Sequence, residues 1–108
     1  MTMILVYITT PNKKEAGKII RHLLEKRLIA CANIFPVKSL YRWKGKIAKG
    51  NEFVAIAKAP AKNYAAIKKE TAKIHPYEIP CIIKISAAAN PEFARWIEEE
   101  TKIPRAAV

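Results

Sequence analysis

The chain has 108 residues, a length that suits one domain with one hydrophobic core. Hydrophobic residues make up 51% of it, which predicts a folded protein, and they form no run long enough for a membrane-spanning helix. Lys and Arg number 20 against 9 acidic residues, a net charge of +11 that suits either a solvated surface or an anionic partner such as nucleic acid.

The N-terminal third predicts a strand followed by an amphipathic helix. Residues 1–10 lack the basic region and cleavage site of a signal peptide, so we expect a soluble cytoplasmic protein. The apolar run at residues 3–8 predicts a strand buried on both faces. Asn12 and Glu15 form a capping pair, and His22 lies on the polar side of the helix as an ordinary surface residue. The apolar stripe consists of Ala16, Ile19, Ile20, Leu23, Leu24 and Leu28.

The middle of the chain predicts a hairpin with a long arm. Residues 28–35 are apolar and extended, and Pro36 is expected to interrupt this strand. In SLYRWKG, Tyr41 and Trp43 then point to one face. We place the turn in KIAKGN, the segment rich in Lys and Gly, before a further strand at residues 53–58.

The C-terminal half predicts two more helices and one strand. The first helix ends at Pro76 and has an apolar stripe made of Tyr64, Ile67, Thr71 and Ile74. Residues 81–85 predict a strand, and residues 104–108 are expected to fray. Asn90-Pro91 opens the final helix, whose inward residues are expected to be Phe93, Trp96 and Ile97.

The order β-α-β-β-α-β with a trailing helix predicts an α+β, ferredoxin-like sandwich over residues 1–108. The exposed face of such a sheet needs a cover for Tyr41 and Trp43, and the arm has a free strand edge. Both features favour association with another subunit. With no Asp, a single well-placed His and no Gly-rich phosphate loop, the chain is not expected to be an enzyme.

Residues 73–81, KIHPYEIPC, gather possible metal ligands. Imidazole and thiolate are the usual ligands of zinc and copper, and carboxylate is a harder third choice. His75, Glu78 and Cys81 are spaced three apart, but the two prolines exclude a helix, so these groups need not share a face. The residues leave two readings open: a metal site, or a structural corner in which Cys81, like Cys31, is a buried inert thiol.

An RNA-binding module is the competing interpretation. The same order of elements occurs in the RNA recognition motif, and KGNEFVAI at residues 49–56 is similar to its third-strand signature. Tyr7 and Phe53 would then stack on bases. Asn51 and Glu52 stand where that motif has an aromatic and a small residue, so nucleic acid is not the favoured partner.

Four segments occur in the order and spacing of one known family: LIACANIFP, SLYRWKGKI, Glu52 with the strand ending at Lys58, and HPYEIP. The chain therefore resembles the CutA divalent-cation tolerance family. That resemblance implies a ferredoxin-like fold, a homotrimer, and an association with copper and other divalent metal ions in the response to metal. It implies no catalytic reaction. A small-molecule or signalling ligand at the subunit clefts is a further alternative.

The resemblance also nominates site residues. Cys31 matches the cysteine of the family's Ala-Cys-x-Asn segment and His75 the histidine of its His-Pro-Tyr segment, so these two are nominated for metal, with Glu78 and Cys81 beside them. The family's subunit contacts are assigned here to Tyr41, Trp43 and Tyr77. Cys81 stands where members usually have Glu, which either favours copper(I) or zinc or is an inert core substitution.

Overall fold

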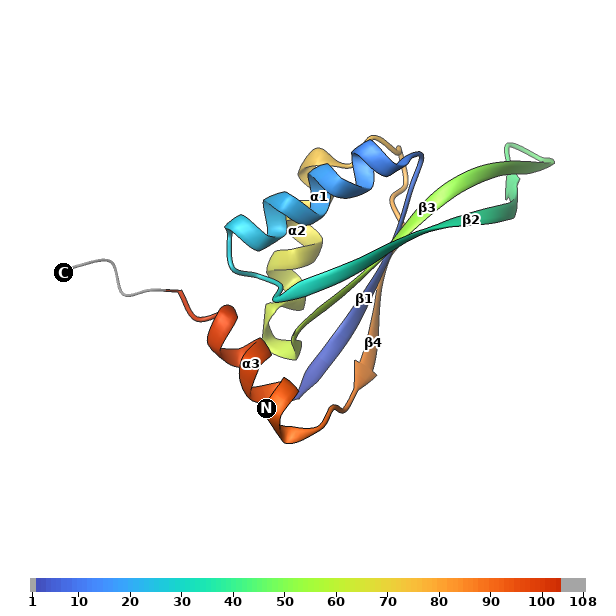
Figure 1. Cartoon of the computed structure of the whole chain (residues 1–108). Coiled ribbons are helices and arrows are strands. Elements are labelled where there is room, and N and C mark those ends of the chain that lie inside the picture. The colour runs from blue at the N-terminus through green and yellow to red at the C-terminus, as the bar shows by residue number, and fades with distance from the viewer. Residues whose placement is uncertain (1, 104–108) are drawn as a thin grey trace.

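The structure, a computed structural model, describes residues 2–103, and the predicted fraying of residues 104–108 lies outside them. Four antiparallel strands form one sheet, and the helices pack on one of its faces (Figure 1). A short 3-10 turn, Ala61–Asn63, precedes the second helix. The elements are β1 (Met3–Thr10), α1 (Lys13–Glu25), β2 (Cys31–Trp43), β3 (Lys46–Pro60), α2 (Tyr64–Ile74), β4 (Ile82–Ala87) and α3 (Pro91–Glu100).

The strand order β2-β3-β1-β4 confirms the predicted ferredoxin-like α+β fold. Each helix α1 and α2 connects two strands that are not neighbours, which carries both helices to the same face of the sheet (Figure 1). The C-terminal helix α3 lies beside the end of the sheet where β1 begins. No helix or strand within residues 2–103 covers the opposite face of the sheet (Figure 1).

The hydrophobic core lies between the sheet and helices α1 and α2. On β1, Ile4, Val6 and Ile8 are buried against the helices, because alternate residues of a strand share a face. Leu23 and Ile67 are buried opposite them, from α1 and α2. The intervening β1 residues are only partly buried, so the prediction of a strand buried on both faces is wrong for a single protomer.

The hairpin differs from its prediction in two places. Pro36 does not interrupt β2; it pairs with Phe53 inside one continuous strand. Proline is tolerated there because β2 is an edge strand, where a missing N–H need not break a ladder hydrogen bond. The turn is Lys44-Gly45 and not KIAKGN, since both residues have positive φ (48° and 78°) and form a two-residue hairpin loop of type I′.

The helices show which local sequence patterns correctly predicted a helix boundary or a buried side chain. The Asn12 side chain accepts from the Glu15 N–H at 2.8 Å, as the capping pair predicts. Helix α1 ends at Glu25, so Leu28 lies beyond the helix whose stripe it was expected to continue. In α3, Ile97 is buried as predicted, but Trp96 is 42% exposed, so its inward placement is wrong in the protomer.

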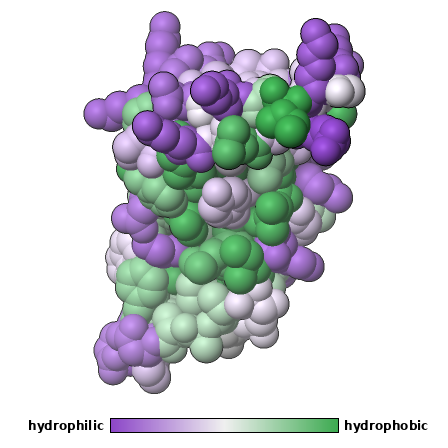
Figure 2. Space-filling model, turned by 90° about the vertical axis from the view of Figure 1, so that its right-hand side faces the viewer, coloured by the Kyte–Doolittle hydropathy of each residue, from purple (hydrophilic) through white to green (hydrophobic). Residues whose placement is uncertain are grey.

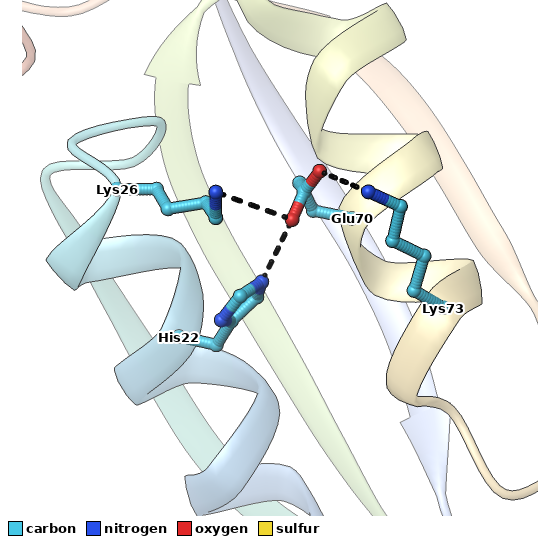
Figure 3. A network of polar contacts seen from close by, with 4 residues as sticks. All are labelled: His22, Lys26, Glu70 and Lys73. Carbon is cyan, nitrogen blue, oxygen red and sulfur yellow. Dashed lines mark hydrogen bonds and ion pairs between the residues drawn. The ribbon is translucent and has the colours of Figure 1, made fainter.

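His22 is not an ordinary surface residue. Its Nε2 lies 2.9 Å from Oε1 of Glu70, which joins α1 to α2 (Figure 3). Lys73 reaches the other oxygen of Glu70 at 3.1 Å, and Lys26 lies 3.7 Å away. The His22 hydrogen bond, then Lys73 and Lys26, lower the pKa of Glu70 from 4.5 to about 2.

This lowered pKa predicts a stability contribution that depends on pH. Because the folded protein holds Glu70 ionised more strongly than the unfolded chain does, the contribution is present above pH 4.5 and is lost as the pH falls toward 2. We therefore expect Glu70→Gln to be less stable than the parent at pH 5 in urea denaturation, with the difference shrinking by pH 2. Glu25→Gln, on the exposed end of α1, is the control. A difference that stays constant over this range would contradict the prediction.

Candidate functional site

A groove runs beside the outer part of the hairpin, from Glu52, where the hairpin leaves the sheet, to Trp43, next to the turn. β3 pairs with β1 only from Phe53 onward, so residues 37–52 extend as a two-stranded ribbon, called the arm here (Figure 1). The segment between α2 and β4 lies beside the base of the arm and closes a groove of about 430 Å³. Its walls bring together five of the nominated residues with Glu52: Tyr41, Trp43, Tyr77, Glu78 and Cys81.

His75 borders this region as a buried structural residue. Its side chain is 9% exposed, and Nε2–H donates to the Thr9 carbonyl oxygen at 2.8 Å. Nδ1 accepts from the Tyr77 N–H at 3.1 Å. A carbonyl can only accept and a backbone N–H can only donate, so the neutral ring uses both nitrogens and keeps no lone pair for a metal. In this conformation His75 fits the second interpretation of residues 73–81, a structural corner, and not the metal site.

Tyr77 is held on its other side by Glu52. The Tyr77 hydroxyl donates to Oε2 of Glu52 at 2.5 Å, and the ring centroids of His75 and Tyr77 lie 4.9 Å apart. Partial burial, and then the hydrogen bond to the Glu52 carboxylate, raise the pKa of Tyr77 above its usual range. Tyr77 therefore remains a donor at neutral pH. Sequence reasoning gave Glu52 no role in this site, because its partner lies 25 residues away.

Cys31 lies at the other end of the open sheet face. It pairs with Lys58, which pairs with Leu5, whereas His75 bonds to Thr9, four residues further along β1. That spacing corresponds to about 13 Å along a strand. Within residues 2–103 no group of three or more His, Cys or acidic side chains is gathered as a metal site. Both cysteines are free and only partly buried, so the predicted burial of the thiols is wrong for the protomer.

Two aromatic residues proposed to stack on RNA bases, Tyr7 and Phe53, do not share a face of the sheet. Ile56 pairs with Tyr7, and Phe53 lies three positions from Ile56 on β3. Side chains alternate along a strand, so Phe53 and Tyr7 lie on opposite faces of the sheet. The stacking platform of an RNA recognition motif is therefore not formed by these residues.

Large hydrophobic side chains remain on the surface. Tyr41 is 47% exposed and Trp43 40% exposed on the arm, and Ile83 and Ile85 are exposed on β4. Figure 2 shows hydrophobic side chains down the middle of this side of the molecule, with hydrophilic ones at the top and along the sides. A hydrophobic patch rimmed by polar residues is typical of an interaction surface. No helix within residues 2–103 has the length and hydropathy needed to cross a membrane.

Comparison with known proteins finds relatives that span nearly the whole chain. The family model described as CutA1 divalent ion tolerance protein matches residues 4–100. Divalent-cation tolerance protein CutA of Archaeoglobus fulgidus is 43% identical over 95 residues, 87% of this chain and 93% of that protein. The protein of that name in Thermotoga maritima is 44% identical over 98 residues, 90% and 97% of the two chains.

Solved structures agree with these sequence matches. The structure of the periplasmic divalent cation tolerance protein CutA from Archaeoglobus fulgidus has a TM-score of 0.91 at 40% identity. The match covers 93% of this chain and 99% of that one. Fold and sequence therefore point to the same relatives.

Proposed function

The chain belongs to the CutA1 divalent ion tolerance family, and on that premise we propose that it is a homotrimer that binds copper or another divalent transition-metal ion. The observation that carries the proposal is the family match over residues 4–100. The proposed role is binding in the response to metal ions, with no catalytic step. The proposed location is the cytoplasm, and cell fractionation would decide between it and the periplasm named for the Archaeoglobus fulgidus relative.

Two surface features support the trimer. The open sheet face and the arm expose aromatic and aliphatic side chains, including Tyr41 and Trp43. β2 is also an edge strand of 13 residues, and a free edge of that length favours pairing with another chain. A closed ring of three copies would cover both features at once.

We propose that the thiols of Cys31 and Cys81 and the carboxylate of Glu78 are the metal donors, in preference to the His75 ring. Cys81 and Glu78 line the groove, and Cys31 lies on the open face. One protomer gathers too few of these groups, so we propose that donors from neighbouring copies combine at the subunit boundary. The His75 ring as folded does not fit a ligand role, because a metal would have to displace Tyr77 N–H or take the proton from Nε2.

Calorimetric titration of the reduced protein with copper(I) under anaerobic conditions tests this site. We expect saturable binding near one ion per chain, because soft thiolates prefer copper(I) to harder ions. Cys81→Ser should weaken the affinity by about tenfold or more, since removing even an outer-shell partner commonly costs 10- to 100-fold. His22→Ala, which alters an imidazole outside the groove, is the matched control. Weak uptake without saturation, with copper(I) and likewise with zinc(II), would contradict the metal role and leave the fold assignment intact.

A further inference from the structure

The arm has two faces, and only one of them carries the aromatic residues that support the trimer. Tyr41 and Trp43 lie two positions apart on β2, so their side chains project to the same face. The alternate residues of β2, with the residues paired to them on β3, project to the opposite face, called the second face of the arm here. It consists of six exposed residues: Lys38, Leu40, Arg42, Ile47, Lys49 and Asn51.

The second face continues the side of the sheet on which the helices pack. Ala55 and Ala57 of β3 are buried in the core beneath the helices, and Lys49 and Ile47 lie an even number of residues away on the same strand. The arm extends past α1 and α2, so no helix within residues 2–103 covers its second face (Figure 1). A trimer that covers the open sheet face and the aromatic face of the arm leaves this second face in contact with solvent. Only this point depends on the proposed trimer.

The second face combines large aliphatic side chains with positive charge. Leu40 and Ile47 are 76% and 74% exposed. Leu40 pairs with Lys49 and Ile47 pairs with Arg42, so the two aliphatic residues are diagonal neighbours, about 7–8 Å apart. Arg42, Lys49 and Lys38 flank them, and within residues 2–103 none of these three cations forms an ion pair with a carboxylate.

This composition fits the surface of an anionic membrane. Lys and Arg remain among anionic headgroups while neighbouring aliphatic side chains enter the boundary with the acyl chains. The carboxylate of the arm, Glu52, lies on the opposite face and accepts from Tyr77, so it does not oppose such contact. Nucleic acid fits less well, because single strands stack on aromatic rings and the six residues of the second face include none.

We propose that the second face of the arm binds the surface of an anionic lipid bilayer. Leu40 and Ile47 enter the headgroup boundary, and Lys38, Arg42 and Lys49 contact the lipid phosphates. The attraction of basic residues to anionic lipids adds to the burial of apolar surface, so both parts of the face contribute to affinity. This activity goes beyond the proposed metal function and needs no metal ion.

Co-sedimentation of the full chain with lipid vesicles tests the proposal. The protein is mixed in EDTA with vesicles of equal parts phosphatidylglycerol and phosphatidylcholine, and separately with vesicles of phosphatidylcholine alone. We expect about tenfold or tighter binding to the anionic vesicles. Raising the salt concentration from about 50 mM to about 300 mM should weaken this binding, because salt screens the surface potential of the bilayer.

One pair of variants tests the aliphatic contribution. Leu40→Ser with Ile47→Ser removes both aliphatic side chains of the second face and should weaken binding to anionic vesicles about tenfold or more. Leu24→Ser with Ile103→Ser removes two exposed aliphatic side chains outside the arm. This control should bind like the parent.

A second pair tests the charge. Arg42→Gln with Lys49→Gln removes two cations from the second face and should also weaken binding about tenfold or more. Lys14→Gln with Lys18→Gln removes two exposed cations from α1, so it lowers the net charge equally. A clearly smaller effect of the α1 variant would show that the arm itself contacts the lipid.

Four results would overturn the proposal. Equal binding to anionic and neutral vesicles, or no binding to either, would contradict it directly. Equal weakening by the arm and α1 charge variants would reduce the effect to net charge. Binding to poly(U) RNA without binding to vesicles would assign the face to nucleic acid. A Leu40→Ser, Ile47→Ser variant that sediments as a smaller species than the parent would make the face a contact between copies.

These outcomes are separable from those of the proposed metal-binding trimer. EDTA keeps the vesicle measurement independent of copper and other metal ions. A parent protein that sediments as a monomer and still binds anionic vesicles through the arm would support the membrane site and contradict only the trimer.

Discussion

Replacing His75 with alanine is expected to lower the free energy of unfolding by about 2–4 kcal/mol. The substitution leaves the Thr9 carbonyl and the Tyr77 N–H without partners in a largely buried corner, and each unpaired buried group costs about 1–3 kcal/mol. The loss should be seen in urea denaturation with EDTA present, because it does not depend on a metal. Protein concentration must be held constant, since subunit association adds to apparent stability.

His22→Ala is the matched control for this measurement. The His22 side chain is partly exposed and pairs with Glu70, so its loss should cost no more than about 1 kcal/mol. Equal small losses for the two variants would contradict the structural role of His75. A His75→Ala loss that appears only when copper is present would assign the ring to the metal instead.

The double variant Tyr41→Ser with Trp43→Ser is expected to convert the proposed trimer to monomer. Large aromatic side chains dominate interface energetics, and both residues expose much of their surface in the protomer. The same exposure means that the protomer core does not depend on them, so far-UV circular dichroism should remain close to that of the parent. Sedimentation velocity at one fixed protein concentration measures the change in mass.

Leu24→Ser is the control for the loss of exposed apolar surface. Leu24 is 40% exposed, like Trp43, but it lies on α1 and not on the arm. It should leave the assembly unchanged. A trimer that survives the double variant would place the main contacts elsewhere, with the edge of β2 as the next segment to test. A parent protein that sediments as a monomer would contradict the trimer itself.

Local patterns predicted much of this fold. The order of helices and strands, the Asn12 cap and the helix stop before Pro76 all depend on residues close together in the chain, and the structure confirms them. The ferredoxin-like topology followed because two β-α-β units of this length have few ways to pack. The family resemblance is carried by four short segments of the sequence and does not depend on the tertiary structure.

Strand pairing decided what local patterns could not. Several Lys and Gly positions in the hairpin were compatible with a turn, and only the pairing of Trp43 with Lys46 selected Lys44-Gly45. From the sequence, Pro36 predicts an interruption of the strand, and only the position of β2 at the edge of the sheet explains why the strand continues. Tyr7 and Phe53 looked like a stacking pair until the pairing of β1 with β3 assigned them to opposite faces.

For the candidate site too, the sequence predicted one part and only the tertiary structure decided the other. Sequence alone selected His75, Tyr77, Glu78 and Cys81 as one unusual segment, because that choice needs only residue types and spacing. It could not assign their roles, since His75 bonds to a carbonyl 66 residues away and Tyr77 to a carboxylate 25 residues away. The sequence determined which groups are present, and the tertiary structure decided which of them already have partners, because hydrogen bonds form between neighbours in space.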